Sequence, residues 1–92
     1  EGRRARPAEG GMVRLFFGLG RRAGIRPQDL VGAITGESYL TGRDIGAIEI
    51  AERFALVEVP DTAADDVIAA MRRTTIKGKR PTVRRDREPA RR

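Results

Sequence analysis

The spacing of the apolar residues switches along this chain between the two-residue period of a strand and the 3.6-residue period of a helix. Such a pattern is found in six segments, residues 12–17, 27–36, 48–50, 54–59, 62–71 and 81–83. The second and fifth segments predict helices, and the other four predict strands. The predicted order of elements is therefore β-α-β-β-α-β.

Individual residues predict where several of these elements begin and end. Pro27 suits the first turn of a helix, where a missing N–H has no partner to lose, and Gly36 is a natural stop. Thr62 and Asp65 have the spacing of a capping box for the second helix. Pro81 cannot donate to a strand ladder, so the last strand should lie at a sheet edge.

The link between the second and third strands, residues 51–53, is short enough only for an antiparallel hairpin. With the order of elements, this predicts an α+β, ferredoxin-like fold, in which a four-stranded antiparallel sheet carries two helices on one face. The alternation assigns a face to each strand residue. We expect the helix-covered face to hold Val13, Leu15, Phe17, Ile48, Ile50, Ala55, Val57 and Val59. We expect the uncovered face to hold Arg14, Phe16, Glu49, Phe54, Leu56 and Glu58.

The positive charge is concentrated near the C-terminus. Residues 72–92 carry ten Lys or Arg and two carboxylates, a net charge of +8, whereas residues 12–71 have a net charge of −3. A basic block of this kind is typical of a segment that binds a polyanion. We predict a flexible basic linker over residues 1–11, one domain over residues 12–85, and a flexible Arg-rich tail over residues 86–92.

The composition argues against an enzyme. The chain has no His, Cys, Asn or Trp, and its one serine, Ser38, has no base to activate it. Acylphosphatases share the predicted topology, but they pair an arginine with an asparagine. Asp65-Asp66 is more typical of a helix N-terminus than of a metal site, and Gly18-Leu-Gly20 is interpreted as a strand-to-helix turn. No catalytic residue and no metal ligand is predicted, and no apolar run reaches membrane-spanning length.

Phe16 and Phe54 should lie next to each other on the uncovered face, on neighbouring central strands. Two exposed aromatic rings form a platform on which bases stack, because every base has a π-face. RNA recognition motif (RRM) domains use the same topology in this way. Leu15-Phe16 satisfies their first-strand pattern, whereas residues 52–57 keep only the first aromatic of their third-strand pattern. Leu56, next on the same face, joins the predicted site.

Basic side chains should border this platform, because the last strand of this topology pairs with the first. We predict that RNA contacts come from Arg14, Arg21, Arg22, Lys77, Lys79, Arg80, Arg84 and Arg85. Arg21 and Arg22 are equally interpretable as solvated loop charges.

Four segments resemble a known family: MVRLFFGLGRRAGIRPQDLVGAI, TGRDIGAIEI, FALVEVP and TTIKGKRPTV. They are similar to the DbpA-type, RRM-like RNA-binding domain that follows the helicase core in some bacterial DEAD-box RNA helicases, particularly the DeaD (CsdA) branch. The resemblance covers residues 12–85, and its most specific blocks are residues 42–46 and 76–79.

The resemblance implies a non-catalytic module that anchors an ATP-dependent RNA helicase on structured or ribosomal RNA, in ribosome assembly or RNA turnover. The expected partners are RNA and the protein's own helicase core. The absence of cysteine fits a cytoplasmic protein, and we expect no membrane partner and a monomeric isolated domain. ATP and magnesium are expected only in the helicase core.

A second hypothesis remains open on the residues alone. The uncovered face of the sheet would bind the helicase core or another copy of the domain, and RNA would be held only by the Arg-rich tail.

Overall fold

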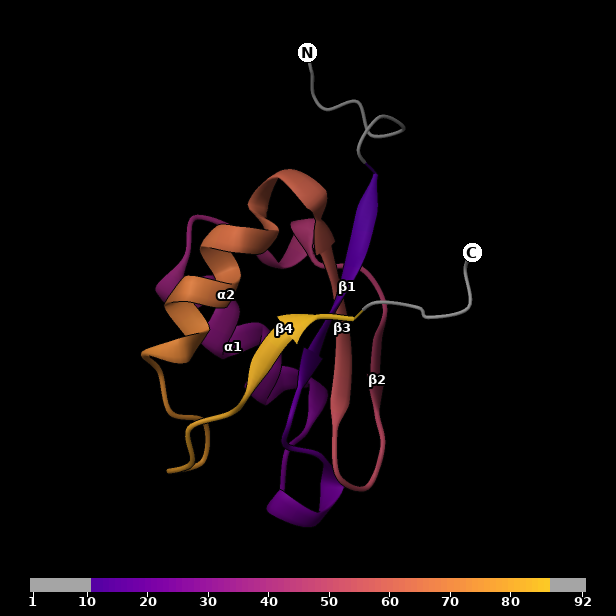
Figure 1. The fold of residues 1–92 in the computed structure, drawn as a ribbon, viewed down its shortest axis with the longest axis vertical. Helices are drawn as coiled ribbons and strands as arrows, with labels where there is room; N and C mark the ends of the chain where they lie inside the picture. The colour runs from indigo at the N-terminus through magenta and orange to yellow at the C-terminus, as the bar shows by residue number, and fades with distance from the viewer. Residues whose placement is uncertain (1–10, 87–92) are drawn as a thin grey trace.

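A computed structural model of the protein describes residues 11–86 (Figure 1). Its helices and strands are β1 (Met12–Phe17), α1 (Pro27–Glu37), β2 (Ile48–Ile50), β3 (Ala55–Pro60), α2 (Ala64–Arg72) and β4 (Val83–Arg85). Short 3-10 turns occupy Arg21–Ala23, Gly42–Asp44 and Asp61–Ala63. The predicted order β-α-β-β-α-β is confirmed.

The strands form one four-stranded sheet in the order β2-β3-β1-β4. Each neighbouring pair is antiparallel, and both helices lie on the same side of the sheet (Figure 1). The predicted α+β fold is therefore confirmed, as is the edge position of the last strand. Since β1 and β3 are the two central strands, side chains on their uncovered face lie in the middle of the open surface.

The core lies between the helices and the covered face of the sheet, where the alternation predicted it. Leu15 and Phe17 from β1 are fully buried, together with alternate residues of β3. The helices contribute a buried set at helical spacing, comprising Leu30, Ile34, Val67 and Met71. Val13, Ile48 and Ile50, also assigned to this face, are partly buried against the same core.

Two predicted helix boundaries are wrong. Helix α1 continues past Gly36 to Glu37, because Gly36 does not adopt the positive φ by which a glycine ends a helix. Helix α2 begins at Ala64 without a side-chain cap. The capping box does not form because Thr62 lies inside the 3-10 turn Asp61–Ala63 and Ala63 takes the N-cap position; the Asp65 carboxylate instead accepts a hydrogen bond from Arg85 (3.3 Å).

The predicted limits of two strands are also shifted. Phe54 stands directly before β3, and the last strand is Val83–Arg85, in place of residues 81–83. Apolar spacing could not detect β4, because its second and third residues are arginines held in the sheet by pairing with β1. Apart from Gly11 and Asp86, the predicted flexible segments at residues 1–11 and 86–92 lie outside the described residues.

Within residues 11–86, neither helix combines the length and the hydropathy needed to cross a bilayer.

Candidate nucleic-acid interface

Phe16 and Phe54 form a stacked pair on the uncovered face of the sheet. Their ring centroids are 5.6 Å apart and their planes are inclined by 22°. The guanidinium carbon of Arg84 lies 4.2 Å from the centroid of the Phe16 ring, within the range of a cation–π contact. Phe54 is 38% exposed. We refer to Phe16, Phe54 and Arg84 as the aromatic platform.

Pairing between strands builds this platform. Phe16 is the register partner of Arg84 on β4 and of Leu56 on β3, and paired residues of an antiparallel sheet present their side chains on the same face. Leu56 is half-buried beside the rings. The sequence predicted that Phe16 and Phe54 are neighbours, and the structure brings Arg84 to the same place.

Gly20 allows the turn after β1 to pack against the β2–β3 hairpin. The backbone N–H groups of Arg21 and Arg22 donate to the carbonyls of Ala51 and Glu52, at 2.8 and 2.9 Å. A Cβ on Gly20 would lie 2.3 Å from the Ala51 oxygen and 2.6 Å from the Phe54 nitrogen. The turn therefore holds the hairpin that carries Phe54, and only glycine permits this approach.

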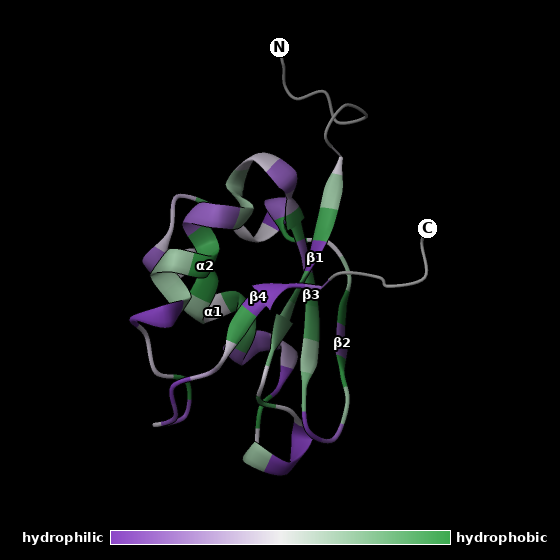
Figure 2. Ribbon diagram, in the orientation of Figure 1, coloured by the Kyte–Doolittle hydropathy of each residue, from purple (hydrophilic) through white to green (hydrophobic). Residues whose placement is uncertain are grey.

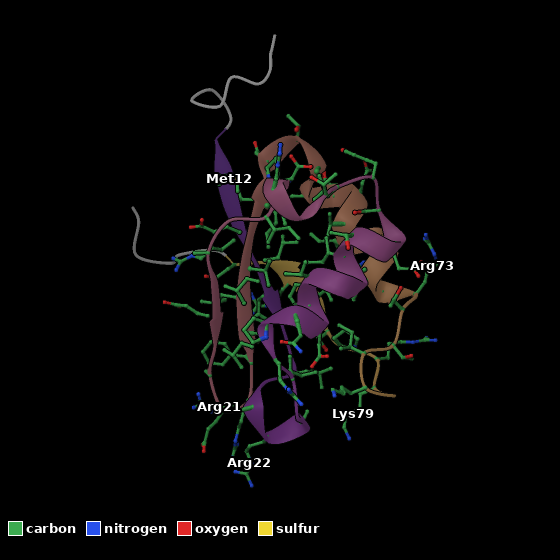
Figure 3. All side chains as sticks on the ribbon, turned by 180° about the vertical axis from the view of Figure 1, so that it is seen from behind. Met12, Arg21, Arg22, Arg73 and Lys79 are labelled. Atoms are coloured by element: carbon green, nitrogen blue, oxygen red, sulfur yellow. The ribbon has the colours of Figure 1, made fainter. Side chains whose placement is uncertain are left out.

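Most of the predicted basic residues lie in loops at one end of the sheet. Phe17 pairs with Ala55 and Val83 at this end, so the segments next to them come together: residues 18–24, 51–54 and 77–82. Figure 3 shows Arg21, Arg22 and Lys79 at the same end of the molecule, with Met12 at the other. Figure 2 shows mainly hydrophilic residues in these loops. We refer to this region as the basic end.

The side chains at the basic end differ in their contacts. Arg21 donates to the carbonyl of Ile50 (3.2 Å) beside the hairpin. Lys77 lies 3.8 Å from the carboxylate of Asp29 on α1, in a turn closed by hydrogen bonds between Ile76 and Lys79. Arg22, Lys79 and Arg80 are exposed.

Sequence reasoning missed Arg53 at this end. It is exposed in the β2–β3 hairpin and directly precedes Phe54. Its position next to a platform residue, in a link predicted to be a tight hairpin, was the signal that could have identified it.

Arg14 and Arg85 lie apart from the basic end and are paired with carboxylates. Arg14 is 3.8 Å from Asp86. Arg85 pairs in register with the buried Leu15, so it faces the helices and contacts Asp61 at 3.0 Å and Asp65 at 3.3 Å. The hydrogen bond to Asp61 is the main cause that raises the pKa of Arg85. The structure thus separates Arg85 from the platform that Arg84 joins.

Carboxylates gather at the end of the sheet opposite the basic end. Pro60 pairs with Met12 there, and the next residues include Asp61, Asp65 and Asp66 at the start of α2. Gly46 packs against Glu58, because a Cβ would lie 2.6 Å from the Glu58 Oε1 atom. The block at residues 42–46, specific to the resemblance, therefore fixes the approach to β2 and lies far from the basic end.

Within residues 11–86, no three His, Cys, Asp or Glu side chains gather closely enough to hold a metal ion.

Comparison with known proteins identifies the family. Residues 14–85 match the family model of the DbpA RNA binding domain. The ATP-dependent RNA helicase DbpA of Bacillus subtilis is 34% identical over 68 residues, which cover 74% of this chain and 14% of the relative. DbpA of Escherichia coli is 36% identical over 76 residues, covering 83% of this chain and 17% of the relative. The ATP-dependent RNA helicase DeaD of Buchnera aphidicola subsp. Schizaphis graminum is 31% identical over 65 residues, which cover 71% of this chain and 11% of the relative.

The chain thus spans at most 17% of the length of these three relatives. The family match covers every strand and helix from β1 to β4, apart from the first two residues of β1. The chain belongs to the DbpA RNA-binding domain family, as the resemblance predicted, and is a non-catalytic, RNA-binding module.

Proposed function

We propose that the aromatic platform is the RNA-binding site of this domain, and that the domain anchors an ATP-dependent RNA helicase on structured RNA, including ribosomal RNA. The observation that carries this proposal is the stacked pair of Phe16 and Phe54 on the uncovered face, with Arg84 over one ring. Stacking contributes about 1–3 kcal/mol per base and tolerates any base.

In this proposal each platform residue has a role. Arg84 already covers a face of Phe16, so a base arriving there stacks on the guanidinium plane, a surface that RNA-binding proteins also use. Phe54 offers its own exposed ring to the next base. The Nη1 atom of Arg84 donates to the carbonyl of Arg85 (3.3 Å), and the other N–H groups of the guanidinium can donate to a phosphate. The platform therefore suits unpaired nucleotides, whose bases are free to stack.

The basic end supplies the electrostatic part of the interaction. Its exposed cations lie beside the platform, and phosphates that they neutralise release counterions, which makes affinity depend on salt. This term is insensitive to sequence, so stacking and electrostatics together suit a general anchor for RNA.

The anchor acts by raising the local concentration of RNA at the helicase core. In this proposal ATP and magnesium are bound by that core, in the cytoplasm, and the whole protein works in ribosome assembly or RNA turnover. The relatives are ATP-dependent RNA helicases, which supports this role.

The test is a titration of a fluorescent RNA hairpin with a single-stranded flank, at several salt concentrations. We expect a Phe16→Ala/Phe54→Ala variant to remain folded and to lose about 1–3 kcal/mol per unstacked base, with the salt slope unchanged. If the variant binds like the original domain, RNA is held elsewhere. The platform would then be a protein interface, and its partner would be the helicase core or a second copy.

A further inference from the structure

A groove of about 520 Å³ runs along one edge of the sheet, between α2 and β4. The two elements lie side by side there, at the edge remote from β2 (Figure 1). Half-buried Ile68 and exposed Ala69 form its apolar wall on α2. The charged side chains around this wall are those of Asp65, Arg72, Arg84 and Arg85. We refer to this site as the edge groove.

The backbone of β4 points hydrogen-bonding groups to the open side of the sheet. The Thr82 carbonyl accepts a hydrogen bond from the Gly18 N–H (2.8 Å), so Thr82 faces β1. Backbone groups alternate in direction along an antiparallel strand, so those of Val83 and Arg85 point away from β1. Within residues 11–86, β4 has no strand on that side. An edge of this kind is a template on which a further strand can pair.

The charge of the edge groove favours an acidic partner. Asp65 is already paired with Arg85 (3.3 Å), so the excess positive charge belongs to Arg72 and Arg84. Arg72 is exposed and makes no ion pair within the described residues. An acidic segment would neutralise both of these arginines.

The same charge disfavours other copies or other parts of this chain as the occupant. Two β4 strands placed edge to edge would bring arginines close to arginines, and like charges on paired strands destabilise a sheet. The two ends of the chain are also basic. Residues 1–10 hold three arginines and two glutamates, and residues 87–92 hold three arginines and one glutamate.

RNA also fits the edge groove less well than a polypeptide does. The side chain of Asp65 is 85% exposed, and the exposed Asp66 follows it, so carboxylates at one end of the groove repel phosphates. In addition, the free groups at an open strand edge match those of another main chain.

We propose that the edge groove binds an extended, acidic segment of a partner protein, which adds a strand beside β4. The side chains of an added strand alternate between the two faces of the sheet. Those on the helix side would lie against Ile68 and Ala69, so they are apolar. Those on the other side would lie near Arg84, so they are acidic. The partner segment therefore alternates apolar and acidic residues, and this interaction goes beyond RNA binding.

The experiment titrates the heptapeptide EVEVEVE, blocked at both ends, into the isotopically labelled chain and follows the backbone amides by NMR. Three modified peptides carry lysine in place of glutamate, N-methyl groups on the valine amides, or N-methyl groups on the glutamate amides. Alternate N–H groups of a strand point to the same neighbour, so only one of the two methylated peptides loses its hydrogen bonds to β4.

Two variants of the chain form a matched pair. Arg72→Glu reverses a charge in the lining of the edge groove. Arg73→Glu reverses the charge of the next residue, which is also exposed but does not line the groove. Both variants are compared with the original chain at about 0.15 M salt, where distant surface charges are screened.

We expect EVEVEVE to shift the amide signals of Ala69, Val83 and Arg85. One of the two methylated peptides should bind at least about tenfold more weakly, because it loses two or more main-chain hydrogen bonds, and the other should bind like the unmodified peptide. The lysine peptide should not bind. Arg72→Glu should weaken binding about threefold, and Arg73→Glu should have a smaller effect.

Several results would overturn the proposal. One is the absence of shifts at these amides, and another is equal binding of the two methylated peptides or of the lysine peptide. Equal effects of Arg72→Glu and Arg73→Glu would also contradict it. If a hexamer of uridines shifts the same amides and the peptide does not, the edge groove belongs to RNA. If these amides shift with protein concentration alone, it belongs to a second copy of the chain.

Discussion

Phe16 and Phe17 are neighbours in the chain and lie on opposite faces of β1. Phe17 is fully buried in the core, whereas Phe16 stacks with Phe54 and lies under Arg84 on the uncovered face. A strand alternates its faces with every residue, so one aromatic residue stabilises the fold and the next is available to a ligand. Gly20 is another single residue with a large effect, because its lack of a side chain lets the turn after β1 contact the β2–β3 hairpin.

The two phenylalanines should therefore differ in their effects on stability. Phe17→Ala removes a buried ring, so we expect the free energy of unfolding to fall by about 3–5 kcal/mol. Phe16→Ala loses mainly its aromatic contacts, worth about 0.5–1.5 kcal/mol. Urea denaturation of the two variants measures both values. Equal losses would show that Phe16 is a structural residue.

Gly20 and Gly32 offer a matched pair of glycine substitutions. Gly20→Ala places a methyl group 2.3 Å from the Ala51 oxygen, so we expect a loss of at least about 1–3 kcal/mol of stability and weaker RNA binding as Phe54 shifts. Gly32 is exposed inside α1 with nothing within 4 Å of an added Cβ. Gly32→Ala should stabilise the domain by about 0.4–1 kcal/mol. Thermal unfolding tests both signs, and a destabilising Gly32→Ala would contradict the argument.

Strand β4 carries two adjacent arginines whose side chains lie on opposite faces of the sheet and make different contacts. Its pairing with β1 sets Arg84 opposite Phe16 and Arg85 opposite Leu15. Arg84 therefore joins the platform, and Arg85 joins two carboxylates near the start of α2. An edge strand of three residues thus connects the face that carries the aromatic platform to the helix layer.

We expect glutamine substitutions of the two arginines in β4 to have different effects on RNA binding and on stability. Arg84→Gln should weaken RNA binding and reduce the salt slope by up to about 0.7, with little change in stability. Arg85→Gln should leave RNA affinity unchanged and cost at most about 1 kcal/mol of stability, since its partners are partly exposed and screened by solvent. RNA titration and urea denaturation of both variants provide the measurements. Loss of RNA affinity in Arg85→Gln alone would place the RNA on the other side of β4.

At the scale of the whole molecule, the fold sorts charge between its two ends. The three loops of the basic end come from separate parts of the sequence and meet because Phe17, Ala55 and Val83 lie side by side in the sheet. The carboxylates near the start of α2 lie at the other end, beside Met12. This polarity would direct a polyanion towards the platform from one side.

The dependence of RNA affinity on salt concentration tests this separation of charge between the two ends of the molecule. A Lys79→Gln/Arg80→Gln variant should reduce the slope of log K against log salt by about 0.7 for each phosphate contact that is lost. Arg43→Gln removes one exposed charge from the turn that leads to Gly46 and β2, near Met12 and Glu58, and should leave the slope unchanged. Equal effects of the two variants would mean that the whole surface attracts RNA non-specifically.

The order of the elements, the antiparallel hairpin, the strand residues that face the core and the proximity of Phe16 to Phe54 could all be predicted from the sequence. These features follow from periodicity and from a short link, which are local properties of the chain. The burial of Ile25, Leu40 and Ile76, which lie in loops and turns, could not be predicted in this way. The C-terminal end of α1 and the start of α2 were predicted wrongly, because Gly36 stays helical and a 3-10 turn over Asp61–Ala63 precedes α2.

Which arginines belong to the platform depends on the packing of the folded chain. Arg84 and Arg85 are equivalent by composition, and the register of β4 against β1 separates them. The turn after β1 lies against the β2–β3 hairpin only in the folded chain, where Gly20 permits the close approach. Contacts of this kind depend on the register between strands and on how loops pack against each other, and the periodicity of the sequence specifies neither.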